Sequence, residues 1–317
     1  MACSNDVSTL AEEIRLRKKT RFRSAGRLMS LAEESPEQTI EILRELSGDP
    51  LPRIILGITG APGSGKSLLA GRMIAAFREC YPDKVIGVIA VDPSSSISGG
   101  AILGDRIRMM QHASDPNVFI RSIASRGQTG GVTLGTMGII SVMGVLGCDM
   151  VIVETVGVGQ MEFAVKEVAD MVAIVMAPGQ GDTMQFLKAG MMEIGDMFII
   201  NKADRSDFSQ FFAQLKNALS LLGRSAKNPV LAVSARDNTG LSELFFVVEK
   251  FFARDHLLWE ISRKERLELL IQRAIFSEFQ KRLKNVLEEK EQDLLKNILE
   301  GGTSLSFAVE SLIEKLK

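Results

Sequence analysis

The segment GAPGSGKS, Gly60 to Ser67, constrains the fold of this 317-residue chain more strongly than any other. It follows the apolar run RIILGIT and precedes a helical pattern, which is the strand–loop–helix context of a phosphate-binding loop. Glycines let backbone amides turn toward phosphate oxygens, and the start of the next helix adds a favourable dipole. This context disfavours a glycine-rich turn without function. A Rossmann dinucleotide loop is disfavoured because the segment lacks the G-x-G-x-x-G pattern.

Apolar runs of strand length alternate with helical segments between residues 53 and 252: RIILGIT, KVIGVIAV, DMVIVET, MVAIVMA, MFIINKA and PVLAVSA. Strands that are apolar throughout are buried on both faces, which is typical of a mostly parallel sheet covered by helices. The sequence therefore predicts an α/β fold. Because ligands of such sheets bind beyond the carboxyl ends of the strands, the residues that follow each strand are the candidates for the functional site.

Helical patterns flank this region, so the sequence predicts a helical N-terminal extension (1–52), an α/β nucleotide-binding domain (53–252) and a helical C-terminal arm (253–317). In SPEQ, Ser35 to Gln38, the serine can cap a helix, the proline suits its first turn and the glutamine can close a capping box. The arm carries an apolar stripe that can pack on the domain or on a second subunit: Leu267, Leu270, Ala274, Leu283 and Leu287. We favour the second subunit, because the domain already has enough helices to cover its sheet.

The phosphate loop supplies the first candidate binding residues: Gly63, Ser64, Gly65, Lys66, Ser67 and Leu68. Lys66 is expected to reach the β- and γ-phosphates of a nucleotide and to support catalysis, and Ser67 is expected to bind Mg²⁺.

The base-recognition candidates follow two later strands. NKAD supplies Asn201, Lys202 and Asp204, and VSARDNTGL supplies Ser234 and Ala235. The Asp204 carboxylate can accept hydrogen bonds from guanine N1–H and its exocyclic amine, a donor pair that adenine lacks. The Ala235 amide is expected to meet guanine O6. This chemistry favours GTP over ATP.

Acidic residues that follow other strands are candidate Mg²⁺ ligands and catalytic groups. Glu154, in ETVGVGQ, stands at the Walker B position, with a buried salt-bridge glutamate as the alternative, and Gly157 can present its amide to the γ-phosphate. Asp92 is expected to face Mg²⁺ and the attacking water. It opens a loop rich in serine and glycine, which a γ-phosphate can order. Asp105 is a further candidate metal ligand, or simply a helix-start carboxylate.

Lys188 lies in APGQGDTMQFLKAG, a glycine-containing segment that an ordinary small GTPase does not need. It can stabilise transition-state charge in the manner of an arginine finger, or it can be a solvated helix lysine.

Composition limits the classes of partner. The formal net charge of −1 provides no global basic field for nucleic acid or an anionic membrane. The apolar runs are too short for a transmembrane helix, and the first residues lack the apolar region of a signal peptide. The basic segment RLRKKTRFR is more typical of a solvated helix face than of a transit peptide, because acidic residues precede it. The three cysteines, few and far apart, favour a reducing compartment, so we expect a cytoplasmic protein.

Together these segments resemble the MeaB/ArgK/MMAA family, chaperones of adenosylcobalamin-dependent mutases that belong to the SIMIBI class of phosphate-loop GTPases. The resemblance rests on GAPGSGKS, VDPSSSISGGAILGDRIRM, FIRSIASRGQTGG, VIVETVGVGQ, GDTMQFLKAG and INKAD. It implies a slow, homodimeric GTPase with GTP or GDP and Mg²⁺ as ligands, a helical dimerisation arm, and methylmalonyl-CoA mutase or a related acyl-CoA mutase as its client. Residues 180–188 match the family's additional switch loop, and Asp92, Asp105 and Glu154 fall on its acidic positions around Mg²⁺.

The chain departs from the family pattern at Gln128, where a histidine is usual, at Met161, where a serine is usual, and at Thr183, where an acid is usual. These positions belong to expected switch or partner surfaces, so they bear on the identity of the client. Other classes fit less well. A nickel metallochaperone would carry His- or Cys-rich segments, a transport-system kinase would need a hydroxyl-substrate site, and a signal-sequence-binding GTPase would gather its methionines on one helical module.

Overall fold

The structure, a computed structural model, describes residues 7–92, 112, 114–124, 129–155, 164–179, 191–221 and 228–253, together with scattered residues between 263 and 310. The predicted site residues Asp105, Gly157 and Lys188 lie outside the described residues. Of Asp92 the backbone alone is described.

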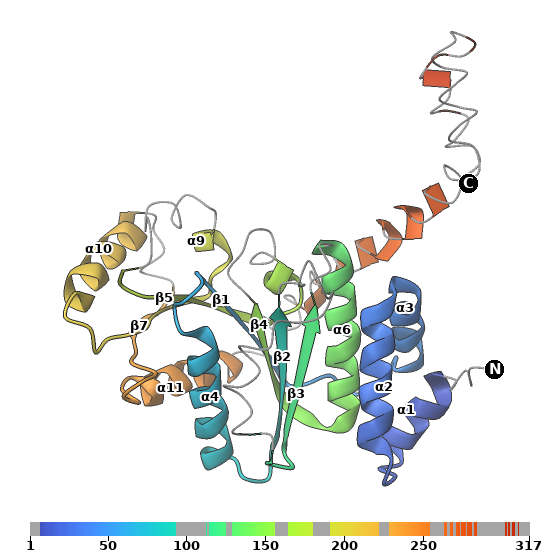
Figure 1. Ribbon diagram of the computed structural model, residues 1–317, viewed down its shortest axis with the longest axis horizontal. Coiled ribbons are helices and arrows are strands. Elements are labelled where there is room, and N and C mark those ends of the chain that lie inside the picture. The colour runs from blue at the N-terminus through green and yellow to red at the C-terminus, as the bar shows by residue number, and fades with distance from the viewer. Residues whose placement is uncertain are drawn as a thin grey trace.

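A parallel seven-stranded sheet forms the centre of the molecule, in the order β3-β2-β4-β1-β5-β6-β7 (Figure 1). The strands are β1 (Ile54–Thr59), β2 (Val85–Asp92), β3 (Val118–Ala124), β4 (Cys148–Thr155), β5 (Met171–Met176), β6 (Met197–Ile200) and β7 (Val230–Ala232). The predicted α/β fold is therefore confirmed. Because β1 lies between β4 and β5, the loops that follow these strands meet at one edge of the sheet.

Strand β3 is the one strand of this sheet that the apolar pattern missed. Its sequence, VFIRSIA, includes Arg121 and Ser122, so it does not read as a continuous apolar run. The physical reason is its position, because β3 is an edge strand that pairs with β2 alone. The Arg121 guanidinium bonds to Ser30 Oγ and Glu33 Oε2 of the N-terminal extension, at 3.0 Å each.

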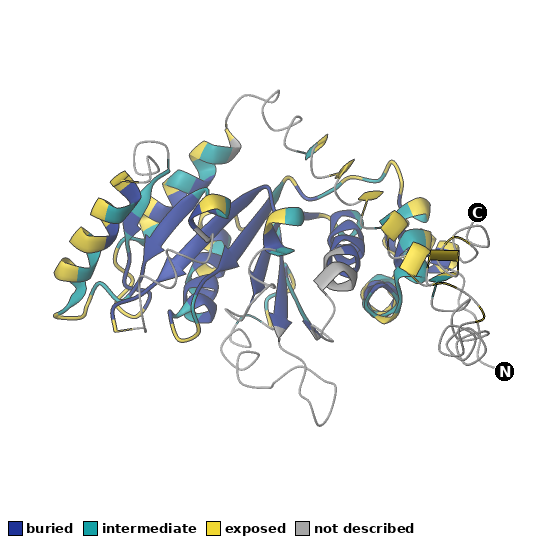
Figure 2. Ribbon diagram, turned by 90° about the horizontal axis from the view of Figure 1, so that it is seen from above, coloured by how far each residue is buried: buried dark blue, intermediate teal, exposed yellow. Residues whose placement is uncertain are grey.

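Helices cover both faces of the sheet, which Figure 2 shows as a buried layer between them. They are α1 (Val7–Arg15), α2 (Arg21–Glu34), α3 (Pro36–Glu45), α4 (Lys66–Cys80), α6 (Thr129–Leu146), α9 (Met191–Ile194), α10 (Phe208–Leu221) and α11 (Leu241–Phe252), with a 3₁₀ turn η2 (Val165–Glu167). Alternate residues of a strand point to opposite faces. Accordingly, Met150 and Ile152 of β4 pack in the core with α4 and α11, whereas Val151 and Val153 pack in the core with α6 and α10.

The N-terminal extension forms a further layer, in which α2 and α3 pack on the outer side of α6 (Figure 1). The approach is close: a Cβ on Gly144 of α6 would lie 2.2 Å from Pro50 O. The extension shares one continuous core with the sheet, since Ile14, Leu28 and Ile42 belong to the same buried cluster as Val151.

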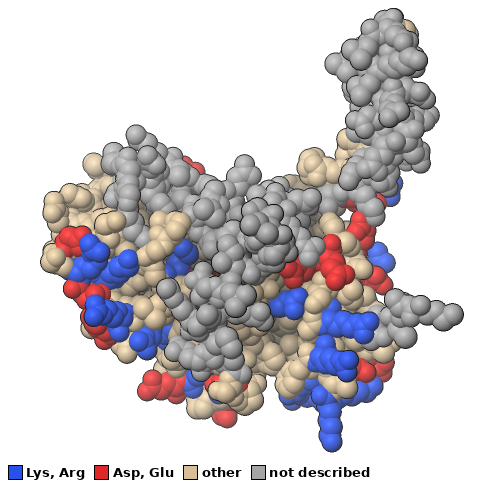
Figure 3. Space-filling model, viewed as in Figure 1, with Lys and Arg blue, Asp and Glu red and all other residues tan. Residues whose placement is uncertain are grey.

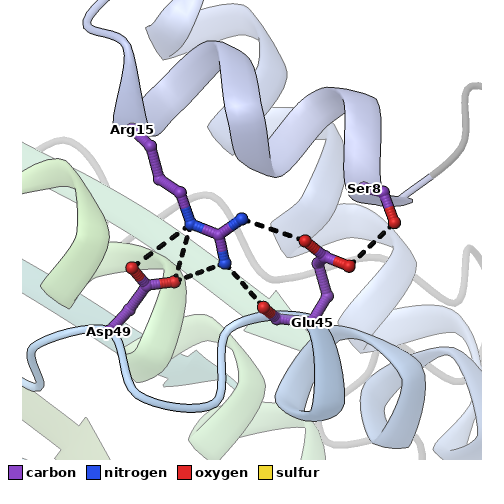
Figure 4. Close-up of polar contacts among 4 residues, drawn as sticks. All are labelled: Ser8, Arg15, Glu45 and Asp49. Carbon is purple, nitrogen blue, oxygen red and sulfur yellow. Dashed lines mark hydrogen bonds and ion pairs between the residues drawn. The ribbon is translucent and has the colours of Figure 1, made fainter.

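One arginine joins the first helix of the extension to the end of the third (Figure 4). Arg15 Nε and a terminal nitrogen bond to Asp49 Oδ2 at 2.9 and 2.6 Å, and the other terminal nitrogen bonds to Glu45 Oε1 at 2.9 Å. Glu45 also accepts from the Ser8 hydroxyl. The bidentate contact with Asp49 depends on the planar guanidinium group of arginine. The neighbouring basic residues Lys18, Lys19 and Arg23 are exposed, as predicted, but Lys18 and Lys19 lie in the turn between α1 and α2, so only Arg23 is on a helix face. Figure 3 shows Lys and Arg side chains on the surface of this N-terminal helical layer.

The predicted start of α3 is confirmed in part. Ser35 Oγ accepts from the Gln38 amide at 3.2 Å, and Pro36 opens the helix. The capping box is not closed, because Gln38 Oε1 is buried without a hydrogen-bond partner among the described residues.

Arg263 of the C-terminal arm contacts the segments that precede β1 and β5, because it donates to Pro52 O at 2.8 Å and to the buried Asp170 Oδ1 at 3.4 Å. No helix within the described part of the chain is long and apolar enough to cross a membrane.

Candidate functional site

The phosphate loop runs from the end of β1 at Thr59 to the start of α4 at Lys66. Three of its glycines adopt a backbone that other residues rarely tolerate, with φ +141° at Gly60, +75° at Gly63 and +89° at Gly65. A Cβ on Gly60 would lie 2.0 Å from Val175 O, and one on Gly65 would lie 2.5 Å from Asn201 Nδ2. The loop is thus wedged between β5 and the residues that follow β6.

The Lys66 ammonium folds back over this loop. Its Nζ donates to Gly60 O at 2.8 Å and to Ala61 O at 3.0 Å, and the side chain is buried. Carbonyl oxygens are neutral acceptors, so a phosphate oxygen at the loop offers this cation a stronger, charge-assisted partner.

Ser67 and Glu154 form the acidic part of the site. Ser67 Oγ donates to Glu154 Oε1 at 2.6 Å, and both residues are buried. The pairing of β1 with β4 places Glu154 opposite Ile58, directly beside the strand that enters the loop. Asp92 ends β2 at the same edge, one residue beyond the pair Val91–Thr155. Hydroxyl and carboxylate oxygens are the ligands that Mg²⁺ prefers, so this donor set fits the ion.

Asn201 connects the phosphate loop to the loop after β7. Its Nδ2 donates to Ser64 O at 2.8 Å, and its Oδ1 accepts from the Ala235 amide at 3.1 Å. The side chain is 2% exposed, so both of these bonds lie away from water. The Ala235 amide therefore already has an acceptor, and a guanine O6 would have to share it or replace Asn201.

Asp204 and Ser234 form a second link between the same two loops. The Ser234 hydroxyl donates to Asp204 Oδ1 at 2.7 Å, and an Arg236 nitrogen lies 3.7 Å from Asp204 Oδ2. The bond from Ser234 is the main cause that lowers the pKa of the Asp204 carboxyl, and Arg236 acts in the same direction. The carboxylate is thereby kept ionised, as an acceptor of two hydrogen bonds must be.

The structure brings most of the predicted residues to one edge of the sheet, close to the end of β1: Gly63, Ser64, Gly65, Lys66, Ser67, Leu68, Glu154, Asn201, Lys202, Asp204, Ser234 and Ala235. One residue that contacts this site was not among the predicted ones. Arg72 of α4 donates from Nε to Ala235 O at 3.0 Å, and nothing in the sequence distinguishes this arginine from others on the surface of a helix.

Comparisons with known proteins agree with the arrangement. The sequence profile of the family described as methylmalonyl Co-A mutase-associated GTPase MeaB matches residues 25–288. A Pyrococcus abyssi protein named as a GTPase is 39% identical over 320 residues, covering 93% of this chain and 98% of its own. The mouse protein named methylmalonic aciduria type A homolog, mitochondrial, is 30% identical over 338 residues, covering 100% of this chain and 76% of its own.

Among solved structures, one titled LAO/AO transport system kinase superposes with a TM-score of 0.60 at 21% identity, over 100% of this chain and 99% of that one. At this level of identity the likeness extends to the fold alone.

Proposed function

We propose that this chain, which belongs to the MeaB family of methylmalonyl-CoA mutase-associated GTPases, gates the loading of adenosylcobalamin into an acyl-CoA mutase and protects that enzyme. As a member of the family the chain is a GTP hydrolase. The family match spans the phosphate loop and every other candidate residue of the nucleotide site. Methylmalonyl-CoA mutase is the first candidate for the client, since the matched family is described by its association with that enzyme.

The observation that supports the nucleotide-binding part of the proposal is the contact between the two halves of the nucleotide site. Asn201 bonds to the phosphate loop through Ser64 O and to the base-recognition loop through the Ala235 amide. A nucleotide bound here would contact the phosphate loop with its phosphates and the loop after β7 with its base, and Asn201 joins these two loops. We assign guanine recognition to Asn201, Lys202, Asp204, Ser234 and Ala235.

We assign phosphate binding to residues 63–68. When bound, Mg²⁺ supplies positive charge to the β- and γ-phosphate oxygens. Ser67 and Glu154 would hold it, together with Asp92 and Asp105. Lys66 leaves the carbonyls of Gly60 and Ala61 and neutralises charge on the phosphates, while Asp92 orients the attacking water. The predicted roles of Gly157 and Lys188 belong to the same proposal.

We also propose that the chain is a homodimer held by its C-terminal arm. The described residues of the arm expose large apolar side chains: Leu267 (52%), Ile271 (52%), Ile275 (64%), Phe276 (57%) and Phe279 (44%). Residues four apart lie on neighbouring turns of a helix, so Leu267, Ile271 and Ile275 share a face. Contiguous exposed apolar surface of this kind marks an interface, and a second copy of the arm presents the same surface.

The test is GTP turnover by the purified protein, with and without methylmalonyl-CoA mutase. We expect slow turnover alone, strong stimulation by the mutase, no stimulation of Lys188→Ala and negligible turnover by Lys66→Ala. Turnover that the mutase leaves unchanged would remove this client from the proposal. Turnover by Lys66→Ala at the wild-type rate would remove the assignment of the phosphate site.

A further inference from the structure

Arg72 lies on the second turn of α4, the helix that starts from the phosphate loop. Its Nε donates to Ala235 O at 3.0 Å, and the side chain is half-buried. This bond is a direct polar link between α4 and the loop that follows β7. It stands apart from the assigned nucleotide contacts, because Arg72 is outside the phosphate-loop motif.

The bond completes a ring. Ser64 O accepts from Asn201 Nδ2, Asn201 Oδ1 accepts from the Ala235 amide, and Ala235 O accepts from Arg72 Nε. Ser64 and Arg72 belong to one continuous stretch of chain, so the covalent backbone closes the ring. Ala235 is consequently held on both sides of its Cα, by Asn201 at its amide and by Arg72 at its carbonyl.

We propose that Arg72 is a positioning residue for guanine recognition, which fixes Ala235 at its carbonyl so that its amide, bonded here to Asn201 Oδ1, can be shared with guanine O6. The inference rests on the proposed function, in which Ala235 is the residue that reads O6. Without Arg72, one anchor of Ala235 is lost while the contacts of Asp204 with guanine N1–H and the exocyclic amine stay intact. Loss of Arg72 would then weaken the contact with guanine O6 and leave the contacts with N1–H and the exocyclic amine unchanged.

The experiment compares full-length Arg72→Met with the wild type by calorimetric binding of three diphosphates. GDP presents both edges of the base. IDP lacks the exocyclic amine that Asp204 reads. 6-Thio-GDP carries sulfur, a weak acceptor, in place of O6. Arg78→Met is the matched control, because it removes the guanidinium that bonds to Asp115, Tyr81 O and Lys84 O at the far end of the same helix.

We expect Arg72→Met to lower the affinities for GDP and IDP by the same factor, about 3- to 10-fold, which corresponds to the net contribution of one hydrogen bond. The affinity for 6-thio-GDP should change less than about twofold, since the contact that Arg72 positions is already weak with that ligand. Arg78→Met should leave all three affinities near the wild-type values. Arg72→Lys, which keeps the charge, is measured as well, so that a folding failure of the methionine variant leaves the inference testable.

An equal loss of affinity for all three ligands would overturn the inference, because it would show a general structural role for Arg72. Unchanged affinities in a folded variant would overturn it too. Failure of the wild type to bind GDP would instead overturn the proposed function, so the two failures are distinguishable.

Discussion

Ser67 Oγ donates a 2.6 Å hydrogen bond to Glu154 Oε1, so the first turn of α4 is joined directly to the end of β4. Both residues are buried, and a buried carboxylate is stable only where polar partners compensate for its lost hydration. If Mg²⁺ bound here, both oxygens would be available as ligands once the Ser67 hydroxyl turned its proton away from Glu154 and gave up this hydrogen bond. In the proposed function the pair would then be the point at which metal binding changes the contacts between the phosphate loop and the sheet.

Replacing Glu154 by glutamine tests this pair. Glu154→Gln keeps an acceptor for Ser67 but removes the charge that attracts the metal. We expect the Mg²⁺ concentration for half-maximal GTP hydrolysis to rise by about 10- to 100-fold. Asp149→Asn is the control, because this carboxylate lies on the same strand at its other end, paired with Lys84. If the two variants showed equal Mg²⁺ dependence, Glu154 would have no part in holding the ion.

The glycines of the phosphate loop should not tolerate a methyl group. Gly65→Ala places Cβ 2.5 Å from Asn201 Nδ2 at φ +89°, so we expect urea unfolding to show a loss of about 1–3 kcal/mol together with weaker GDP binding. Gly26→Ala is the matched control on α2, where no atom lies within 4 Å of the new Cβ. It should stabilise the protein by about 0.5–1 kcal/mol, because alanine is the better helix former. A neutral Gly65→Ala would mean that the loop can shift without cost.

Asp204→Asn should convert the base preference from guanine to xanthine. The asparagine amide can donate to the 2-oxo group of xanthine, whereas the carboxylate can only accept. Competition of GTP and XTP against a fluorescent nucleotide measures the change, with Asp207→Asn as a control three residues away. Retained preference for GTP in Asp204→Asn would contradict the assignment of this carboxylate.

The same carboxylate predicts that the base preference, measured by the same nucleotide competition, does not depend on pH between 7 and 5. The hydrogen bond from Ser234 lowers the pKa of Asp204. The carboxylate therefore stays ionised in the folded protein when the pH falls below the ordinary pKa of an aspartate. The stability that this group contributes is present above its unfolded pKa and is lost only as the pH falls through the lower folded pKa. Between pH 7 and pH 5 the preference for GTP should accordingly be constant.

The sequence predicted the parts of the fold that depend on local pattern. Continuous apolar runs identified the buried strands, because burial on both faces leaves no polar side to interrupt them. The edge strand β3 escaped because Arg121 points to the N-terminal extension, a contact between distant segments that no local pattern records. The capping box at Ser35 shows the reverse error. The local pattern predicts two reciprocal hydrogen bonds, and the structure forms the one from the Gln38 amide to Ser35 Oγ but leaves Gln38 Oε1 without a partner among the described residues.

The same division holds for the site. Motifs located the phosphate loop and the residues after β6 and β7, because their spacing is tied to strand ends. That Asn201 joins Ser64 to Ala235 depends on the order β1-β5-β6-β7, which places these loops in one row. The contact of Arg72 with Ala235 could not have been found, since it depends on the position of a helix relative to a loop more than 160 residues away.

The two described free cysteines should differ in reactivity. Burial raises the pKa of the Cys148 thiol to about 12, whereas Cys80 is exposed. Thiolates are the reactive form, so at pH 8 iodoacetamide should label Cys80 and leave Cys148 unmodified until the protein unfolds. The raised pKa also means that the contribution of Cys148 to stability is complete below its unfolded pKa and declines as the pH rises above it. Peptide mass mapping after a timed reaction measures how fast each cysteine is modified. Early labelling of Cys148 would contradict its burial.

The proposed dimer gives the last prediction. Ile271→Asp and Ile275→Asp place charges on the exposed face of the arm, where they cost little in an isolated chain but much inside an apolar interface. We expect the double variant to be a monomer by light scattering at concentrations at which the wild type is a dimer, with an unchanged affinity for GDP. Phe246→Asp is the matched control, because Phe246 is equally apolar and 61% exposed but lies on α11, outside the arm. A wild type that is monomeric, or a double variant that stays dimeric, would mean that the exposed face of the arm has another partner.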